Sequence, residues 1–258
     1  MFLAIDAGNT RVTLGFFEKD LLKDLCSFSC EKNIDFSELK MKIKSLSAGK
    51  NVSACSIASV VEELTNPLQQ AVSEIFNIQP SVLLPHKNCG IKLNTPYPEK
   101  CGADRVANAY AASKLYDQRP IIIVDSGSAT TFDIVNKYNE FAGGVIMPGM
   151  GIQLKALGEK TSKLPELDLN NIKDNINVIS DNTEEAIYAG VVVAHAQAVQ
   201  GLINLCEKEL GDKAYIVGTG GNINFVEKYM NERTFDVINP HLTLEGIKML
   251  YELQSGII

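Results

Sequence analysis

The chain has 258 residues, of which 45% are hydrophobic and 21% charged, and its formal charge is −7 at neutral pH. This length suits one large domain or two of ordinary size, and the negative charge argues against nonspecific binding to nucleic acid or to an anionic membrane. No apolar run approaches the length of a membrane span and the start lacks a signal peptide's basic region, so we expect a cytoplasmic protein.

The first half of the chain alternates predicted strands with predicted helices. Apolar and β-branched runs on either side of Gly8-Asn9 predict two strands joined by a turn. Apolar residues at helical spacing predict a helix that is closed by Gly49. The predicted strands of this half cover residues 2–6, 12–18, 52–59 and 81–84, and the predicted helices cover residues 36–49, 67–77 and 103–116. A loop rich in Pro, Asn and Lys runs from Pro85 to Cys101.

A second series of elements begins at Pro120. Residues 183–210 predict one long helix with Thr183 as its cap and two glutamates in the first turn, where the helix dipole favours acids. A polar stretch from Lys160 to Asp181 predicts a loop before it. The predicted strands cover residues 121–125, 129–135, 141–149, 214–218 and 235–238, and the last helix covers residues 242–254. Strands alternating with helices indicate an α/β protein.

One turn in each half matches the other. "AIDAGNTRVTLGFF" and "IVDSGSATTFDIV" both run from an apolar strand through Asp, a small residue, Gly and two more small residues into a second strand. Asp6 and Asp125 are 119 residues apart, and so are Gly8 and Gly127. A match at a domain-sized separation predicts two similar halves.

Both turns have the composition of a phosphate-binding turn. Gly8 and Gly127 permit a close backbone approach, and successive N–H groups in such a turn form an anion-binding nest. Asp6 and Asp125 can hold a cation or its water shell. Two such turns suit one nucleotide bound in a cleft, although a pair of ordinary hairpins has the same pattern. A P-loop and a G-x-G-x-x-G motif are absent, and "GTGG" at 218–221 offers another backbone approach to adenosine or phosphate.

The cysteines and histidines do not predict a metal site. Cys26 and Cys30 form a C-x3-C pair, but no second pair and no nearby histidine completes a zinc site. A disulfide framework is not expected in a chain with so large a core, so we expect all six cysteines to be reduced. His195 lies in the apolar part of the long predicted helix, which favours a packed histidine over a ligand.

Five motifs resemble, in order and spacing, the type III pantothenate kinases of the acetate and sugar kinase/Hsp70/actin superfamily. They are "DAGNT" at 6–10, "CGADR" at 101–105, "VDSGSATT" at 124–131, "GGVIMPG" at 143–149 and "TGG" at 219–221. The resemblance covers nearly the whole chain. Ser128 stands where the family usually has Thr, and it keeps the hydroxyl group.

The resemblance implies an α/β fold of two actin-like (ribonuclease H-like) domains that face a nucleotide cleft. Residues 1–117 are expected to form the N-terminal domain, with the first phosphate turn and the GADR segment. Residues 118–258 are expected to form the C-terminal domain, with the second phosphate turn and the Gly turn on the adenosine side.

The resemblance also implies an activity, ATP-dependent phosphorylation of pantothenate to 4'-phosphopantothenate, the first step of coenzyme A biosynthesis, by a homodimer without nucleic-acid or membrane partners. It implies Asp104 as general base, a divalent metal such as Mg²⁺ held partly by Asp6, and a monovalent cation, K⁺ or NH₄⁺, at Asp125. The implied ATP contacts are Asp6, Ala7, Gly8, Asn9, Thr10, Arg11, Val12, Thr13 and Ser128. The implied pantothenate contacts are Tyr97, Gly102, Ala103, Asp104, Arg105 and Thr183.

Other interpretations of these residues stay open at the level of sequence. Asp104 and Arg105 also fit a helix-start acid next to a surface arginine, and Thr183 also fits a simple helix cap. The family includes proteins named Bvg accessory factors, so a non-catalytic regulator of the same fold is the alternative function. Intact Asp6, Asp104 and Asp125 favour catalysis. Exopolyphosphatases and sugar kinases of the superfamily are disfavoured because they are usually longer and lack G-A-D-R at this spacing.

Overall fold

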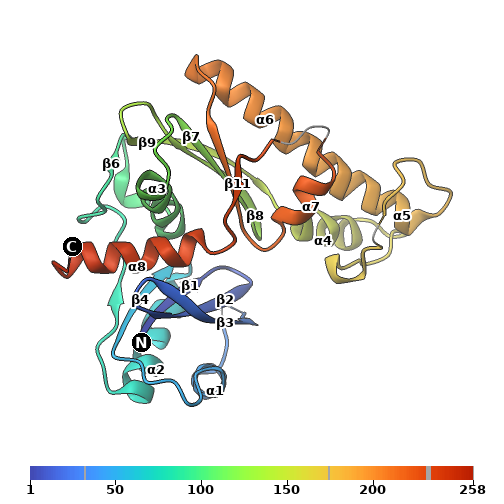
Figure 1. The fold of residues 1–258 in the computed structure, drawn as a ribbon. Helices are drawn as coiled ribbons and strands as arrows, with labels where there is room; N and C mark the ends of the chain where they lie inside the picture. Colours follow the sequence, from blue (N-terminus) through green and yellow to red (C-terminus); the bar gives the residue numbers. More distant parts are fainter. Residues whose placement is uncertain (32, 174, 231–233, 258) are drawn as a thin grey trace. The chain divides into compact units, whose positions relative to one another are not determined.

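The structure, a computed structural model, describes residues 1–31, 33–173, 175–230 and 234–257 (Figure 1). It consists of two compact units, one formed by Met1–Tyr116 together with the segment from His241 onward, and the other by Asp117–Pro240. The boundary near residue 117 is where the sequence placed it, but the C-terminal segment was assigned to the second domain and belongs to the first unit.

Close packing explains why the last helix, α8 (Leu242–Gln254), joins the first unit. It packs against α3 (Ala103–Leu115) and β1 (Phe2–Ala7). A Cβ atom at Gly246 would lie only 2.2 Å from the Ala107 carbonyl oxygen of α3, so the glycine lets the two helix backbones approach. Thr243 Oγ1 also donates to Asn108 Oδ1 at 2.8 Å. These contacts join distant parts of the chain and leave no local sequence signal.

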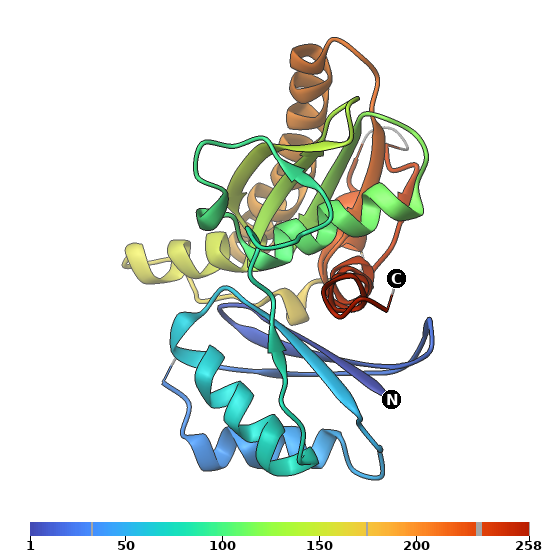
Figure 2. The same ribbon diagram turned by 90° about the vertical axis from the view of Figure 1, so that its left-hand side faces the viewer.

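The first unit is built on a five-stranded sheet of order β3-β2-β1-β4-β5. The strands β1 to β3 form an antiparallel meander, whereas β4 runs parallel to β1 and β5 parallel to β4. The other strands of this sheet are β2 (Arg11–Glu18), β3 (Leu21–Ser29), β4 (Ala54–Ser59) and β5 (Ser81–Val82). The helices α1 (Phe36–Leu46) and α2 (Glu62–Phe76) pack side by side, as Figure 2 shows. Short elements are β6 (Lys92–Leu93) and the 3₁₀ turn η1 (Pro98–Lys100).

The strands of the second unit repeat the same order. They run β9-β8-β7-β10-β11, with an antiparallel meander from β7 to β9 and parallel pairing of β7 with β10 and of β10 with β11. Their bounds are β7 (Ile121–Ser126), β8 (Ala129–Val135), β9 (Glu140–Pro148), β10 (Tyr215–Thr219) and β11 (Val237–Ile238). The prediction of two similar halves is therefore confirmed: β1 corresponds to β7, and so on to β5 and β11.

The register places the two matching aspartates at equivalent positions. Asp6 is the second-to-last residue of β1 and lies opposite Thr13, while Asp125 is the second-to-last residue of β7 and lies opposite Thr131. The first turn is one residue longer than the second, because Asp6 and Thr13 are further apart in sequence than Asp125 and Thr131.

The helices of the second unit pack on an apolar core that includes Ile122, Phe132 and Val192. They are α4 (Met150–Lys160), α5 (Thr183–Tyr188), α6 (Ala194–Leu210) and α7 (Ile223–Lys228), and a 3₁₀ turn, η2, covers Leu169–Asn171. A π-helical segment, η3 (Ala189–Val193), joins α5 to α6, so residues 183–210 form the single long helix that the sequence predicted.

This long helix needs a correction to the sequence-based statement on membrane spans. Its 28 residues are long and apolar enough to cross a membrane, although no apolar run of that length was expected. Half of the most apolar window is buried inside the protein, and Val191, Val199 and Ile203 belong to the core of the second unit. A core helix accounts for this apolar character.

Three further predictions differ from the structure. The strand β3 was not predicted, because Lys23 and Asp24 interrupt its apolar alternation. The helix α2 begins at Glu62, five residues before the predicted start at Pro67, which lies inside the helix. The cap of α5 is Asn182 rather than Thr183. The six cysteines are all free thiols in the structure.

Candidate functional site

The first phosphate turn connects β1 to β2 through exposed residues. The Gly8 N–H donates to the Arg11 carbonyl at 3.0 Å and closes the turn. The carbonyls of Ala7 and Thr10 accept N–H groups from Val60 and Cys30, each at 3.1 Å. The side chains at the tip, Asn9 and Thr10, are exposed. This turn therefore directs its carbonyls toward other parts of its own unit and presents its tip to solvent.

The predicted ATP contacts of this turn differ in what they can offer. Ala7 and Val12 are fully buried, so only their backbone atoms are available to a ligand. Asp6 and Thr13 keep partial exposure and can use their side chains. Arg11 is exposed, and its Nη1 donates to Ser27 Oγ of β3 at 2.8 Å, which fixes the guanidinium group at the start of β2.

The second phosphate turn has its carbonyl groups occupied by two neighbouring elements. Asn222, in the turn after β10, donates its N–H to the Ser126 carbonyl at 2.9 Å and its Nδ2 to the Gly127 carbonyl at 3.4 Å. The Gly149 N–H, at the start of α4, donates to the Ser128 carbonyl at 3.1 Å. Because C=O and N–H point in opposite directions across a trans peptide, the N–H groups of Ser128 and Ala129 point away from Asn222 and Gly149. Adjacent backbone N–H groups in a turn can form an anion-binding nest where they converge.

Two glycines let other backbone segments press against this turn. A Cβ at Gly149 would lie 2.3 Å from the Ser128 carbonyl oxygen. A Cβ at Gly220 would lie 2.4 Å from Asp125 Oδ1 and 2.7 Å from the Ser126 nitrogen, and Gly220 has a φ of +90°. The "TGG" motif thus places the Asp125 carboxylate and the second turn against the loop that follows β10.

Asp104 lies in the first turn of α3, two residues after the N-cap residue Gly102. Its Oδ1 accepts the Arg105 N–H at 2.8 Å, and a Cβ at Gly102 would lie 2.5 Å from the same oxygen. Burial raises the pKa of the Asp104 carboxyl, and the Arg105 N–H and guanidinium charge oppose this shift. A carboxylate with a raised pKa is a stronger base than an ordinary aspartate, while the helix N-terminus still favours its charged form.

The remaining predicted substrate contacts lie in both units. Tyr97 is 57% exposed, and Lys100 Nζ lies 4.6 Å from the centre of its ring. Thr183 is an exposed first residue of α5, and the helix is capped by Asn182, whose Oδ1 accepts the Glu185 N–H at 2.9 Å. A cavity of about 480 Å³ is lined by Asn182 and Glu184, the two neighbours of Thr183 in sequence. The Thr183 hydroxyl is thus not needed for capping and is available for another contact.

The possible metal ligands among the described side chains can be compared with the predicted metal sites. Among the residues that the structure describes, no three His, Cys, Asp or Glu side chains gather into a group that could hold a metal ion. Mg²⁺ in phosphate-transferring sites takes one or two carboxylates, and its other ligands are phosphate oxygens and waters. Single carboxylates at Asp6 and Asp125, each next to a turn with anion-binding character, fit an ion that arrives with a nucleotide.

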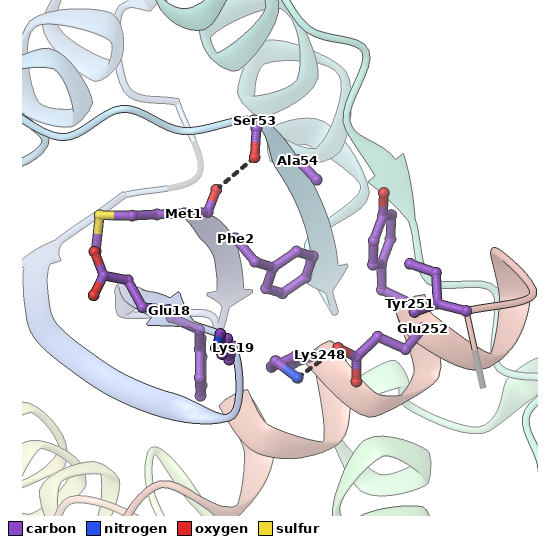
Figure 3. A pocket seen from close by; sticks show the side chains of 11 residues that line it. Met1, Phe2, Glu18, Lys19, Ser53, Ala54, Lys248, Tyr251 and Glu252 are labelled. Atoms are coloured by element: carbon purple, nitrogen blue, oxygen red, sulfur yellow. Dashed lines mark hydrogen bonds and ion pairs between the residues drawn. The ribbon is translucent and has the colours of Figure 1, made fainter.

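A cavity of about 450 Å³ lies in the first unit (Figure 3). Phe2 and Tyr251 lie in its wall with ring centres 4.8 Å apart, and Lys248 Nζ bonds Glu252 Oε1 at 2.6 Å. Phe2 begins β1 and Asp6 lies four residues further on, about 13 Å along an extended strand. The described lining of this cavity includes none of the predicted site residues.

A duplicated five-stranded order, with an Asp and a Gly turn after the first strand of each copy, defines a two-domain protein of the actin-like class, which includes sugar kinases and Hsp70. A sequence model of the type III pantothenate kinases matches residues 2–205, and the chain belongs to this family. A type III pantothenate kinase from Exiguobacterium sp. is 34% identical over 257 residues, covering 98% of both chains. That of Agathobacter rectalis is 34% identical over 261 residues, covering 99% of this chain and 98% of the relative.

Solved structures support the fold. A protein described as a conserved Baf family transcriptional activator from Campylobacter jejuni has a TM-score of 0.61 and 19% identity, covering 98% of this chain and 99% of that one. The ethanolamine utilization protein EutJ from Carboxydothermus hydrogenoformans has a TM-score of 0.58 and 14% identity, covering 96% and 89%. At these identities the likeness concerns the fold alone.

Two contributors to the second turn were not predicted from the sequence. Gly149 was noted only within the "GGVIMPG" motif, and Asn222, which follows "TGG", was not singled out. Their roles depend on hydrogen bonds to Ser128 and to Gly127, the latter 95 positions from Asn222. The only sequence signal for these two contributors was the glycines of the two motifs, because a glycine next to a polar residue at a strand end often marks a close backbone approach.

Proposed function

We propose that this protein phosphorylates pantothenate with ATP to give 4'-phosphopantothenate, the first step of coenzyme A biosynthesis. Membership of the type III pantothenate kinase family over nearly the whole chain supports the substrate. The observation that carries the chemistry is the Asp104 carboxylate, fixed at a helix start by the Arg105 N–H and made more basic by burial. Transfer of a γ-phosphoryl group requires a positioned alcohol and a group that accepts its proton.

In the proposed reaction the pantothenate hydroxyl oxygen forms a bond to the γ-phosphorus, and the bond from that phosphorus to the β–γ bridging oxygen breaks. Asp104 accepts the hydroxyl proton, and ADP leaves. Because phosphoryl transfer has a loose transition state, orientation of the hydroxyl by Asp104 contributes as well as its basicity. Tyr97, the segment Gly102–Arg105 and Thr183 are proposed to bind pantothenate.

ATP is proposed to contact the first turn, Asp6 to Thr13, and the second turn through Ser128. The N–H groups of Ser128 and Ala129 suit phosphate oxygens, since their orientation is set by Asn222 and Gly149. Mg²⁺, which neutralises phosphate charge when bound, is proposed to be held in part by Asp6. Asp125 is proposed to bind K⁺ or NH₄⁺ through a carboxylate that Gly220 leaves room for. We further propose a cytoplasmic homodimer.

The alternative, a non-catalytic regulator like the Bvg accessory factors, is not favoured. The curated relatives at 34% identity carry the kinase name, and Asp6, Asp104 and Asp125 are all present. The similarity to the Campylobacter jejuni protein is one of fold only, at 19% identity.

The first test is a direct assay of the product. Purified protein with ATP, Mg²⁺ and pantothenate in potassium buffer is expected to give phosphopantothenate, detected by its mass. Replacing K⁺ with Na⁺ at constant ionic strength should lower the rate, because the proposed Asp125 site discriminates between cations by size and ligand number. Absence of product from folded protein over a wide ATP range would overturn the kinase assignment, and equal rates in both salts would remove the monovalent site.

Substitutions at Asn182 and Thr183 separate the capping of α5 from the proposed contact with pantothenate. We expect Asn182→Ala to lose about 1 kcal/mol of unfolding free energy, because it removes the acceptor of the Glu185 N–H. Thr183→Ala should cost little stability and raise the KM for pantothenate by about three- to tenfold, the effect of one lost hydrogen bond. Thermal unfolding and steady-state kinetics on both variants measure the two effects. An unchanged pantothenate KM in Thr183→Ala would exclude Thr183 from the substrate contacts.

A further inference from the structure

A chain of buried polar side chains lies beside the second phosphate turn. His195 of α6 is only 2% exposed, and Ser126 and Thr130 are fully buried. His195 Nε2 lies 3.0 Å from Thr130 Oγ1, and Thr130 Oγ1 lies 3.5 Å from Ser126 Oγ. On its other side, His195 Nδ1 lies 2.9 Å from Gln153 Nε2 of α4. Polar groups buried so deeply require partners, and each of these has one.

The donors and acceptors fix the form of the imidazole. Gln153 Nε2 has two hydrogens, and it donates one to the Pro148 carbonyl at 2.9 Å and the other to His195 Nδ1. Nδ1 is therefore the acceptor, and the Nε2–H donates to Thr130 Oγ1. A protonated ring would turn a second donor toward Gln153, so the neutral ring is the form that fits. Burial also lowers the pKa of His195, which favours the neutral form.

These bonds form a closed connection around the turn. Ser126 and Thr130 face each other in the last residue pair of β7 and β8 before the turn. On the opposite side, the Gly149 N–H holds the Ser128 carbonyl, and Gly149 caps the helix that carries Gln153. His195 thus links the strand pair at the base of the turn to the helix that holds its tip.

We propose that His195 is a positioning residue for the second phosphate turn, holding Thr130 and Gln153 so that the Ser128 and Ala129 N–H groups keep a ligand-binding orientation. This proposal rests on the proposed function only in naming the ligand as a nucleotide phosphate. His195 acts through Thr130 and Gln153 and touches no reacting atom. Its position two residues after the π-helical segment 189–193 fits this role, because such segments frequently occur at functional sites.

The test compares variants of His195 and Thr130. His195→Phe keeps the ring volume and removes both hydrogen bonds, and we expect the KM for ATP to rise about tenfold or more while the KM for pantothenate changes much less. His195→Gln, which can still donate to Thr130, should recover much of the ATP affinity. Thr130→Val should resemble His195→Phe. The double variant with both changes should be no worse than either single variant, because each change breaks the same hydrogen-bonded connection.

Two measurements keep this test separate from loss of fold and from the kinase assignment. Gln197→Leu is the matched control, because Gln197 lies on the same helix and donates to the Tyr229 carbonyl at 2.7 Å, away from the turn. It should lower stability without changing the ATP KM. Hydrogen exchange of the peptide that covers residues 124–131 reports on the turn without any substrate, and it should be faster in His195→Phe and Thr130→Val. Unchanged exchange in both variants would overturn the positioning role, even if the protein proved to have another activity.

Discussion

Asp104→Asn should lower the turnover number for pantothenate phosphorylation by about 10²- to 10⁴-fold, the usual contribution of a general acid or base. The amide keeps the shape of the side chain and its oxygen can still accept the Arg105 N–H, which the carboxylate accepts at 2.8 Å. What it loses is the ability to take the hydroxyl proton. ATP affinity, measured by calorimetry, should stay close to that of the unchanged protein, because Asp104 is assigned to pantothenate.

The same variant should be at least as stable as the unchanged protein at neutral pH. Burial raises the pKa of Asp104 above its ordinary value of 3.8, so the folded state binds more protons than the unfolded state between the two pKa values. Stability therefore falls as the pH rises through this window, and the ionised carboxylate costs stability above it. Asparagine removes this cost. Thermal unfolding should show an advantage for Asp104→Asn at neutral pH that shrinks as the pH is lowered toward 3.8.

Asp35 provides a matched control in the same unit. It caps α1, where its Oδ1 accepts the N–H groups of Ser37 at 2.8 Å and Glu38 at 3.2 Å. Asparagine caps helices about as well as aspartate, so Asp35→Asn should change neither stability nor turnover appreciably. If Asp104→Asn turned over pantothenate at a near-normal rate, Asp104 would not be the base and the proton would leave by another route.

The sequence was most informative where the chemistry is local. The repeated Asp-x-Gly turns predicted two similar halves, and the strand orders of the two units agree with this. Their apolar strands could be recognised because β1 and β7 are short, buried runs with an Asp as the second-to-last residue. By contrast, β3 is not predicted because the consecutive residues Lys23 and Asp24 put a charged side chain on each of its faces and interrupt the apolar pattern. The sequence predicts a helix start at Pro67, since proline is favoured in the first helical turn, but α2 begins earlier and Glu62 and Glu63 form its first turn.

The features that were not predictable depend on pairs far apart in the chain. His195 bonds Thr130 and Gln153, which are 65 and 42 positions away, and nothing in the local pattern of α6 indicates them. The assignment of α8 to the first unit likewise rests on the approach of Gly246 to Ala107. Local sequence does show that a glycine is present, but not which backbone it approaches.

Gly220→Ala should have the second large effect, because no side chain fits at this position. A Cβ would lie 2.4 Å from Asp125 Oδ1 and 2.7 Å from the Ser126 nitrogen, and the φ of +90° is one that residues with a Cβ rarely adopt. Backbone strain and overpacking of this kind cost about 1–3 kcal/mol each. We expect a clear loss of unfolding free energy and a loss of ATP-dependent turnover of about tenfold or more, because a 1 Å displacement of a binding group can cost that much.

A variant of the neighbouring glycine, Gly221, tests whether the effect is specific to Gly220 or whether any substitution in this loop is destabilising. A Cβ at Gly221 would meet no heavy atom of the protein within 4 Å, so Gly221→Ala should leave the free energy of unfolding close to normal. The contrast between adjacent positions depends on the Asp125 carboxylate and the base of the second phosphate turn lying against Gly220. Equal behaviour of the two variants would mean that Asp125 and Ser126 can move away without loss, and the proposed role of this turn in ATP binding would then have to be abandoned. A loss confined to Gly220→Ala, with K⁺ dependence weakened as well, would connect the monovalent-cation site and the phosphate turn through this one contact.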